Sequence, residues 1–263
     1  MPTRAIILAA GQGTRLRPLT NDTPKCLVEL AGQALLYRQL AVMRAAGIED
    51  ITLVGGYRLD QLEATGLPVI ENPRYDSTNM VSTLFCAEAV MGDDADLLIA
   101  YGDIVYEPRV LKSLLASPAP LALAVDREWR RFWAARMDDP LADAETLVLE
   151  DSDRVVELGK KPDSYERIQG QYMGLIKVRA DQVPDFRQFY AGLDREAIYD
   201  GKNFDNMYMT SFIQALIDAG REVRAAFTDN GWLEVDTVAD LELYHRMYDS
   251  GRLVDFIDLE RAG

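Results

Sequence analysis

A glycine-rich segment with basic neighbours is the part of the sequence best suited to chemistry. Residues 8–16 read LAAGQGTRL, and a Pro-Lys pair at 24–25 follows. Gly11 and Gly13 permit unusual backbone conformations and place no side chain in front of the main chain, so amide groups can converge on phosphate oxygens. Arg15 adds a planar fork suited to phosphate, and the lysine adds a mobile positive charge. The segment therefore predicts a phosphate-binding loop.

Two better-known phosphate-binding loops do not match this segment. A Walker A loop requires GxxxxGK followed by Ser or Thr, a pattern that the sequence lacks. A dinucleotide fingerprint requires a third glycine or alanine and an acidic residue about 20 positions later. Leu16 occupies the third glycine position, and the second strand ends in Gly55-Gly56 instead of a carboxylate. The loop is therefore expected to bind a nucleotide in another way.

Carboxylates that could hold a divalent metal follow two apolar strands. Asp103 comes after the run DLLIAYG, and Asp236 ends the run GWLEVD. Such positions open into the ligand crevice when the strands lie in a parallel sheet, although an aspartate there can equally cap a loop or a helix. Mg²⁺ usually takes one or two carboxylates and completes its shell with phosphate and water. Glu234 points to the same side of its strand as Asp236 and is a second-choice ligand.

The elements that must position these residues alternate along the chain. Expected strands are 4–10, 51–55, 68–71, 96–101, 120–126, 147–150, 154–158, 170–178, 222–228 and 231–235. Expected helices are 33–46, 57–64, 79–91, 108–116, 179–191, 206–219 and 237–249. This alternation predicts an α/β fold of the Rossmann-like, doubly wound type, with a mostly parallel sheet covered on both faces.

We expect one domain over residues 1–263, because no Pro/Ser-rich linker divides the chain. Residues 1–126 would form the nucleotide-binding half. Residues 127–263 would carry the acceptor-binding flap, at 127–146, and the second half of the sheet. The flap is expected because this stretch interrupts the alternation with two tryptophans, basic residues and then acidic ones.

Composition limits the partners and the compartment. The formal charge of −15 argues against nucleic acid and against an anionic membrane. The first 48 residues nevertheless carry six basic and two acidic side chains, which favours a small anionic ligand there. No apolar run is long enough to span a bilayer, and two cysteines make no disulfide framework, so a cytoplasmic location is expected. The sequence leaves the oligomeric state open, a homodimer included.

The string LAAGQGTRLRPLT followed by PK resembles the signature of the sugar-1-phosphate nucleotidyltransferase superfamily, which includes phosphocholine cytidylyltransferases and has a GT-A-like fold. The resemblance implies Mg²⁺ bound by Asp103 and Asp236, with Arg15, Lys25 and these two aspartates as the catalytic residues. It also implies a nucleotide site made of Leu8, Ala10, Gly11, Gly13, Thr14, Arg15, Lys25, Asn79 and Ser82. Asn79 and Ser82 also stand where a helix would be capped.

The acceptor needs no strong protein base in such a reaction. A phosphomonoester has a second pKa near about 6 and is largely dianionic at neutral pH, so its oxygen is already a competent nucleophile. Catalysis then reduces to in-line positioning and charge neutralisation. The single histidine, His245, is accordingly not expected to act.

The remaining segments resemble CTP:phosphoglutamine cytidylyltransferases of capsule phosphoramidate biosynthesis, in stretches such as VDREWRRFW, DPLADAETL, ELGKK and QYMGL. The implied acceptor residues are Trp129, Trp133, Glu145, Lys160, Lys161, Tyr172 and Asp205. The aromatic rings, with Tyr101, could face a cationic head group, and Asp143, Glu145 or Asp205 could meet an α-ammonium. Alternatively, at least two of the rings pack in the core. The two lysines could instead belong to a solvated basic turn.

The sequence thus predicts a Mg²⁺-dependent cytidylyltransferase. It would transfer CMP from CTP to a small zwitterionic phosphomonoester, phosphoglutamine or phosphocholine-like, with release of pyrophosphate. A sugar-1-phosphate nucleotidyltransferase is the alternative within the same enzyme class. A non-catalytic, nucleotide-sensing subunit on the same fold is the alternative of another class.

Overall fold

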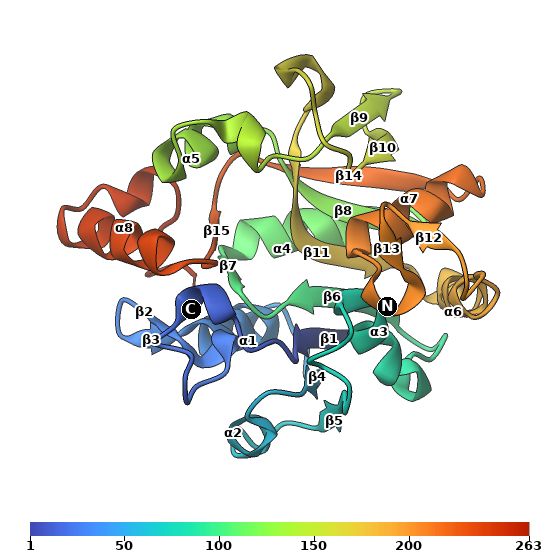
Figure 1. Ribbon diagram of the computed structural model, residues 1–263, viewed down its shortest axis with the longest axis horizontal. Coiled ribbons are helices and arrows are strands. Elements are labelled where there is room, and N and C mark those ends of the chain that lie inside the picture. The colour runs from blue at the N-terminus through green and yellow to red at the C-terminus, as the bar shows by residue number, and fades with distance from the viewer. Residues whose placement is uncertain (263) are drawn as a thin grey trace.

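A nine-stranded sheet organises the chain in the computed structural model, which describes residues 1–262 (Figure 1). The strand order is β5–β4–β1–β6–β11–β8–β14–β10–β9. Their bounds are β1 Thr3–Ala9, β4 Asp50–Gly55, β5 Val69–Glu71, β6 Asp96–Tyr101, β8 Leu121–Asp126, β9 Leu147–Glu150, β10 Arg154–Leu158, β11 Gln171–Val178 and β14 Val223–Thr228. Strands β5, β4, β1 and β6 are mutually parallel, as are β8 and β14. The predicted α/β fold with a mostly parallel sheet is confirmed.

Antiparallel pairs interrupt this pattern in the second half of the sheet. β11 runs antiparallel to both β6 and β8, and β9 and β10 form an antiparallel edge beside β14. Three short ribbons lie outside the sheet: β2 Glu29–Leu30 with β3 Gln33–Ala34, β7 Ile104–Tyr106 with β15 Trp232–Glu234, and β12 Ile198–Tyr199 with β13 Lys202–Asn203. The expected strand at 231–235 therefore exists, but it pairs with β7 and not with the main sheet.

Helices cover both faces of the sheet. They are α1 Leu35–Ala45, α2 Leu59–Glu63, α3 Met80–Cys86, α4 Pro108–Ala116, α5 Trp129–Arg136, α6 Val183–Ala191, α7 Met209–Asp218 and α8 Val238–Asp249. Successive side chains of β1 point to opposite faces, so Ile7 joins an apolar cluster with α1, α4, α5 and α8, while Ile6 joins another with α3, α6 and α7. These two clusters are the core, and burial on both faces explains the continuous apolar run of the strand.

The predicted flap at 127–146 contains an eight-residue helix, α5, that packs against the core. In Figure 1, α5 lies beside α8 at the left of the molecule. Trp129 and Trp133 are 4% and 5% exposed. The indole of Trp133 contacts the rings of Phe132 and Trp232. The structure thus places both tryptophans in the core, the packing alternative, and not on an open wall.

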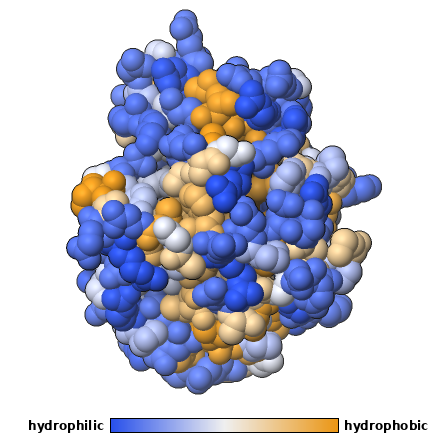
Figure 2. Space-filling view, turned by 90° about the vertical axis from the view of Figure 1, so that its right-hand side faces the viewer, coloured by the Kyte–Doolittle hydropathy of each residue, from blue (hydrophilic) through white to orange (hydrophobic). Residues whose placement is uncertain are grey.

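Polar groups dominate the face of the molecule seen from the right of Figure 1. Figure 2 shows this face, where hydrophilic residues cover most of the surface and smaller apolar areas lie between them. No helix in the described part of the chain is long and apolar enough to cross a lipid bilayer.

Candidate active site

A cavity of about 510 Å³ lies where the first loop meets the ends of several strands. Its wall combines the glycine-rich loop, the start of α3 and a group of carboxylates. The lining residues are Leu8, Ala9, Ala10, Gly11, Gln12, Gly13, Thr14, Arg15, Lys25, Cys26, Tyr75, Asp76, Thr78, Asn79, Met80, Thr83, Gly102, Asp103, Glu234 and Asp236. The structure therefore brings together every predicted nucleotide-site residue except Ser82.

The glycine-rich loop has its shape because of one glycine above all. Gly13 has a φ of 70°, a left-handed conformation that disfavours other residues. A Cβ atom at Gly13 would also lie 2.9 Å from the Cβ of Lys25. The Thr20 hydroxyl donates a hydrogen bond of 2.8 Å to the Gly13 carbonyl and holds the loop. At Gly11, by contrast, a Cβ would meet no atom within 4 Å, so that position offers open main chain to a ligand.

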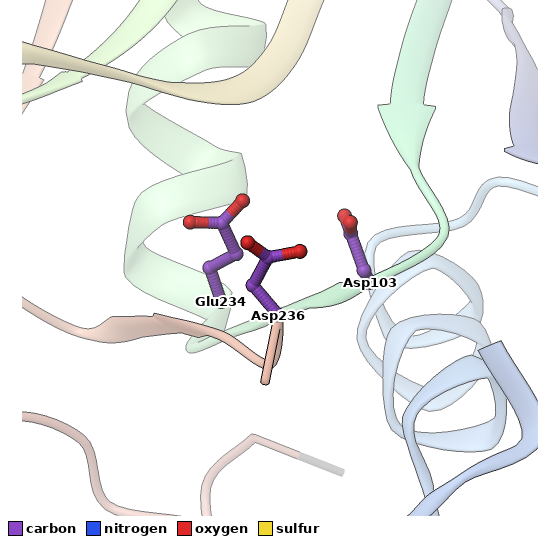
Figure 3. A group of neighbouring side chains, drawn as sticks. All are labelled: Asp103, Glu234 and Asp236. Atoms are coloured by element: carbon purple, nitrogen blue, oxygen red, sulfur yellow. The ribbon is translucent and has the colours of Figure 1, made fainter. Parts of the chain in front are cut away.

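Three carboxylates form a compact group beside this loop. The oxygen atoms that Asp103, Glu234 and Asp236 can offer all lie within 4.8 Å of one another (Figure 3). The β7–β15 ribbon brings them together, because it pairs Ile104 with Glu234 and the Val235 amide donates to the Asp103 carbonyl at 3.0 Å. The group thus joins segments more than a hundred residues apart. It includes Glu234, which the sequence offered as a second-choice ligand.

Asp103 reaches this group through a close approach of two strands. A Cβ atom on the preceding residue, Gly102, would lie only 2.7 Å from the Leu8 carbonyl oxygen. One carboxylate oxygen of Asp103, Oδ1, is buried and has no hydrogen-bond partner in the protein. A buried carboxylate oxygen without a donor is costly, and coordination of a cation would satisfy it. The donor set therefore fits Mg²⁺.

Two cations offset the charge of the carboxylate group. The Lys25 ammonium lies 2.6 Å from Asp103 Oδ2 and 2.8 Å from Asp236 Oδ1. Arg15 contacts the other oxygen of Asp236 at 2.5 Å, and its side chain is 67% exposed. Burial alone would lower the pKa of Lys25, but Asp103, Asp236 and Glu234 outweigh it and hold that pKa well above its usual value. Lys25 is therefore a permanent cation at the centre of the site.

The start of α3 forms the opposite wall of the cavity. Asn79 lines the cavity and caps the helix, since its side-chain oxygen accepts a hydrogen bond of 2.8 Å from the Met80 amide. Ser82 turns away, and its hydroxyl donates to the Asp205 carbonyl at 2.9 Å. The structure therefore places Ser82 outside the cavity, and its role toward the nucleotide stays a prediction.

Several polar lining residues were missed in the sequence. Gln12 sits inside the recognised loop, whereas Tyr75, Asp76, Thr78 and Thr83 come from the segment around the start of α3. Asn72 holds this segment by donating hydrogen bonds of 3.0 Å to the hydroxyls of Thr78 and Thr83. The run ENPRYDSTN, which precedes α3, was a usable signal, because polar residues gather there between a strand and a helix.

Some predicted acceptor residues form a second group next to the carboxylates. Tyr172 makes an edge-on contact with Tyr101, with ring centroids 5.8 Å apart. Burial raises the pKa of the Tyr172 phenol, and the charges of Glu145 and Asp103 act in the same direction. The Lys160 ammonium pairs with the Asp200 carboxylate. These residues surround a region rich in carboxylates.

Glu145 has the most perturbed carboxyl group of this second region. Its side chain reaches the surface, but partial desolvation and the charges of Asp143 and Asp200 raise its pKa to about 7. Gln171 fixes the main chain of Glu145 on both sides, accepting from its amide at 3.2 Å and donating to its carbonyl at 2.6 Å. A cation brought beside Glu145 would favour the ionised form.

The other predicted acceptor residues have protein partners already. The Lys161 ammonium donates to the carbonyls of Leu141 and Ala142, both at 2.6 Å. Asp205 accepts two hydrogen bonds of 2.9 Å from the guanidinium of Arg74. Neither residue lines the cavity described above.

Comparison with known proteins gives consistent results. Residues 5–198 match the family model described as the MobA-like NTP transferase domain. The chain is 43% identical over 248 residues to the CTP:phosphoglutamine cytidylyltransferase of Campylobacter jejuni, and the alignment covers 91% of this chain and 98% of that enzyme.

Two solved structures share the fold. One is the CTP:phosphocholine cytidylyltransferase of Streptococcus pneumoniae, with a TM-score of 0.72 at 21% identity over 95% of this chain and 99% of that one. The other is the inositol-1-phosphate CTP transferase of T. maritima, with a TM-score of 0.69 at 23% identity over 98% of both chains. At these identities the likeness concerns the fold alone.

Proposed function

Because the chain belongs to the MobA-like NTP transferase domain family and is therefore a nucleotidyltransferase, we propose that it transfers CMP from CTP to a small phosphomonoester and releases pyrophosphate. One observation carries this proposal above the others. A single cavity unites an open glycine-rich loop, an exposed arginine, a partly buried lysine and three converging carboxylates. Nucleotidyl transfer needs these elements, because it develops negative charge at the α-phosphate and on the departing pyrophosphate.

The protein's own residues have distinct tasks in this reaction. Main-chain amides around Gly11 and Gly13 and the side chain of Arg15 bind the triphosphate. Lys25 supplies a fixed positive charge beside the α-phosphate. Asp103 and Asp236, with Glu234 beside them, would hold Mg²⁺, which when bound neutralises phosphate charge as a Lewis acid. The acceptor phosphate attacks as its own dianion, so the residues need only orient it.

The acceptor is proposed to be zwitterionic, with phosphoglutamine first. The relative that is 43% identical is named for that substrate, and it aligns over almost its whole length. Glu145 lies beside Tyr172 in a region that also holds Asp143 and Asp200, which suits a ligand that carries an ammonium group. A phosphocholine-like acceptor would use the same features, whereas the 1-phosphate of a neutral sugar would bring no ammonium group to Glu145.

Pyrophosphate release tests this function directly. The protein is mixed with CTP and Mg²⁺ and with phosphoglutamine, phosphocholine or glucose 1-phosphate in separate reactions, and products are followed by ³¹P NMR. We expect pyrophosphate and a CMP-linked product, with phosphoglutamine the best acceptor. Nucleotide binding without turnover for every acceptor would favour the nucleotide-sensing subunit. Asp103→Asn is the matched control, since it retains the loop and removes one carboxylate charge.

Roles in capsule phosphoramidate biosynthesis and a cytoplasmic location stay predictions from the sequence, as does the homodimer. Turnover with phosphoglutamine would connect the enzyme to a later reaction that consumes the CMP-linked product.

A further inference from the structure

A buried ion pair lies directly behind the metal-binding carboxylates. Arg136, the last residue of α5, has a side chain that is 4% exposed, and Asp240, in the first turn of α8, has one that is 7% exposed. The guanidinium contacts both Asp240 oxygens, with Nε at 2.9 Å and a terminal nitrogen at 3.2 Å. A buried pair of this kind often adds little net stability, so its other contacts deserve inspection.

This pair is connected to two of the site carboxylates, Glu234 at the end of β15 and Asp236 just after it. The second terminal nitrogen of Arg136 donates to Glu234 Oε2 at 3.4 Å. Asp240 Oδ2 accepts from the amide of Asp236 at 3.3 Å and from the amide of Thr237 at 2.9 Å. The Arg136 guanidinium thus contacts the side chain of Glu234 directly and, through Asp240, the main-chain amide of Asp236.

Aromatic rings enclose Arg136 on its other sides. Its guanidinium carbon lies 5.3 Å from the ring centroid of Phe132 and 5.5 Å from that of Trp133. Tyr244 stacks on Phe132, and its hydroxyl donates to the Glu234 carbonyl at 2.9 Å. This surrounding excludes water, which strengthens the interactions of the guanidinium with the carboxylates. The flap aromatics therefore have a task in the site although they do not touch the cavity.

We propose that Arg136 is a positioning residue, which with Asp240 holds Glu234 and Asp236 in the geometry that binds the metal-nucleotide complex. The inference rests on the proposed function for its ligand, CTP with Mg²⁺. It assigns α5, a helix from the middle of the chain, to the support of the metal-binding residues. Partners of this kind commonly change metal affinity by roughly 10- to 100-fold when they are removed.

Calorimetric titration of CTP measures this role when it is done with Mg²⁺ and again with EDTA. The double variant Arg136→Met/Asp240→Asn removes both charges of the buried pair together, so that neither is left without its partner, and it frees the Glu234 carboxylate from its contact with Arg136. Mg²⁺ raises the affinity of the original chain for CTP by some factor, and we expect that factor to be roughly 10- to 100-fold smaller in the double variant. Its affinity for CTP in EDTA should stay close to that of the original chain. The Mg²⁺ concentration for half-maximal turnover should rise by a similar factor.

Lys177→Met is the matched control. Its ammonium is as well buried, with the side chain 5% exposed, but it donates to the carbonyls of Leu115 and Ser117 away from the cavity. This variant should lower the melting temperature and leave the effect of Mg²⁺ unchanged. An equal loss in both variants would overturn the inference, because the effect would then follow stability alone.

A second variant keeps the test decisive if the double variant does not fold. Arg136→Lys retains the charge and loses the fork, so it should show part of the loss. A folded Arg136→Lys protein with the full Mg²⁺ effect would overturn the positioning role. Absence of any Mg²⁺ effect in the original chain would instead contradict the metal in the proposed function, which separates the two failures.

Discussion

The nucleotide cavity and the region around Glu145 differ in how their charges are arranged. In the cavity, cations and carboxylates converge, with Lys25 within 2.8 Å of both Asp103 and Asp236. Around Glu145, carboxylates gather with fewer cations, and Lys160 is paired with Asp200 at its edge. The first arrangement suits a reaction that many acceptors could share, whereas the second suits discrimination among acceptors. Mutations should therefore affect turnover in the first region and acceptor affinity in the second.

Loss of a carboxylate that is proposed to bind the metal is expected to have the largest effect. Asp103→Asn or Asp236→Asn should lower kcat by roughly 100- to 1,000-fold, because charge stabilisation at the reacting phosphate is lost. The melting temperature should change little, since each substitution also reduces repulsion among three neighbouring carboxylates. Steady-state kinetics and thermal unfolding measure both quantities. Asp50→Asn, which alters only a surface pair with Arg4, is the control. Full activity in either variant would remove the metal assignment.

Crowding between the loop and Lys25 should have the next largest effect. Gly13→Ala introduces a Cβ 2.9 Å from the Lys25 side chain and forces a φ of 70° on alanine. We expect kcat/KM for CTP to fall by roughly 10- to 100-fold, because the lysine is displaced from a site where small shifts in position are costly. Gly47→Ala has the same backbone strain at a φ of 82° but meets no atom within 4 Å. It should lose stability and keep its affinity for CTP. Equal kinetic losses in both variants would mean that strain, and not the lysine, is responsible.

Much of the nucleotide cavity could be predicted from sequence because local rules determine it. A glycine loop after a buried strand and an aspartate after another must reach the same edge of a parallel sheet. Glu234 could be found for the same reason, since alternate strand residues share a face. The α/β fold class could be predicted because short strand patterns alternate with longer helical patterns along the chain. The prediction was less accurate for β11, whose antiparallel direction leaves no trace in its own composition.

The supports of the site could not be predicted, because they depend on pairings between distant segments. Arg136 meets Asp240 across 104 positions in the chain, and the capping box that Thr237 and Asp240 form at the start of α8 does not indicate this partner. The burial of Trp129 and Trp133 follows from the packing of α5 against α8, which periodicity in an eight-residue helix does not specify. The placement of Ser82 also depends on a distant contact, because its hydroxyl donates to the main chain of Asp205, 123 positions later in the chain.

Acceptor binding should depend on the ionisation of Glu145. Its pKa is raised to about 7, so the carboxyl group is partly protonated at neutral pH and ionises as the pH rises. An ammonium-bearing acceptor prefers the ionised form. Its KM should therefore fall as the pH increases from about 6 to 8, while the KM for CTP changes less. Glu145→Gln should raise the acceptor KM by roughly 10-fold and abolish that pH dependence. An unchanged pH profile in Glu145→Gln would assign the titration to another group, the acceptor phosphate included.

The smallest kinetic effect is expected from a flap tryptophan. Trp133→Phe removes the hydrogen bond of 3.0 Å from the indole nitrogen to Asp143 and part of a buried ring. We expect the free energy of unfolding to fall by about 1 to 3 kcal/mol, because a cavity remains in the core and a hydrogen bond is lost. The KM for either substrate should change by less than about twofold, since the ring does not line the cavity. Denaturant unfolding and steady-state kinetics on the same preparation measure both. A rise in the acceptor KM without a loss of stability would instead show that Trp133 belongs to the acceptor site. The acceptor region around Glu145 would then include part of α5.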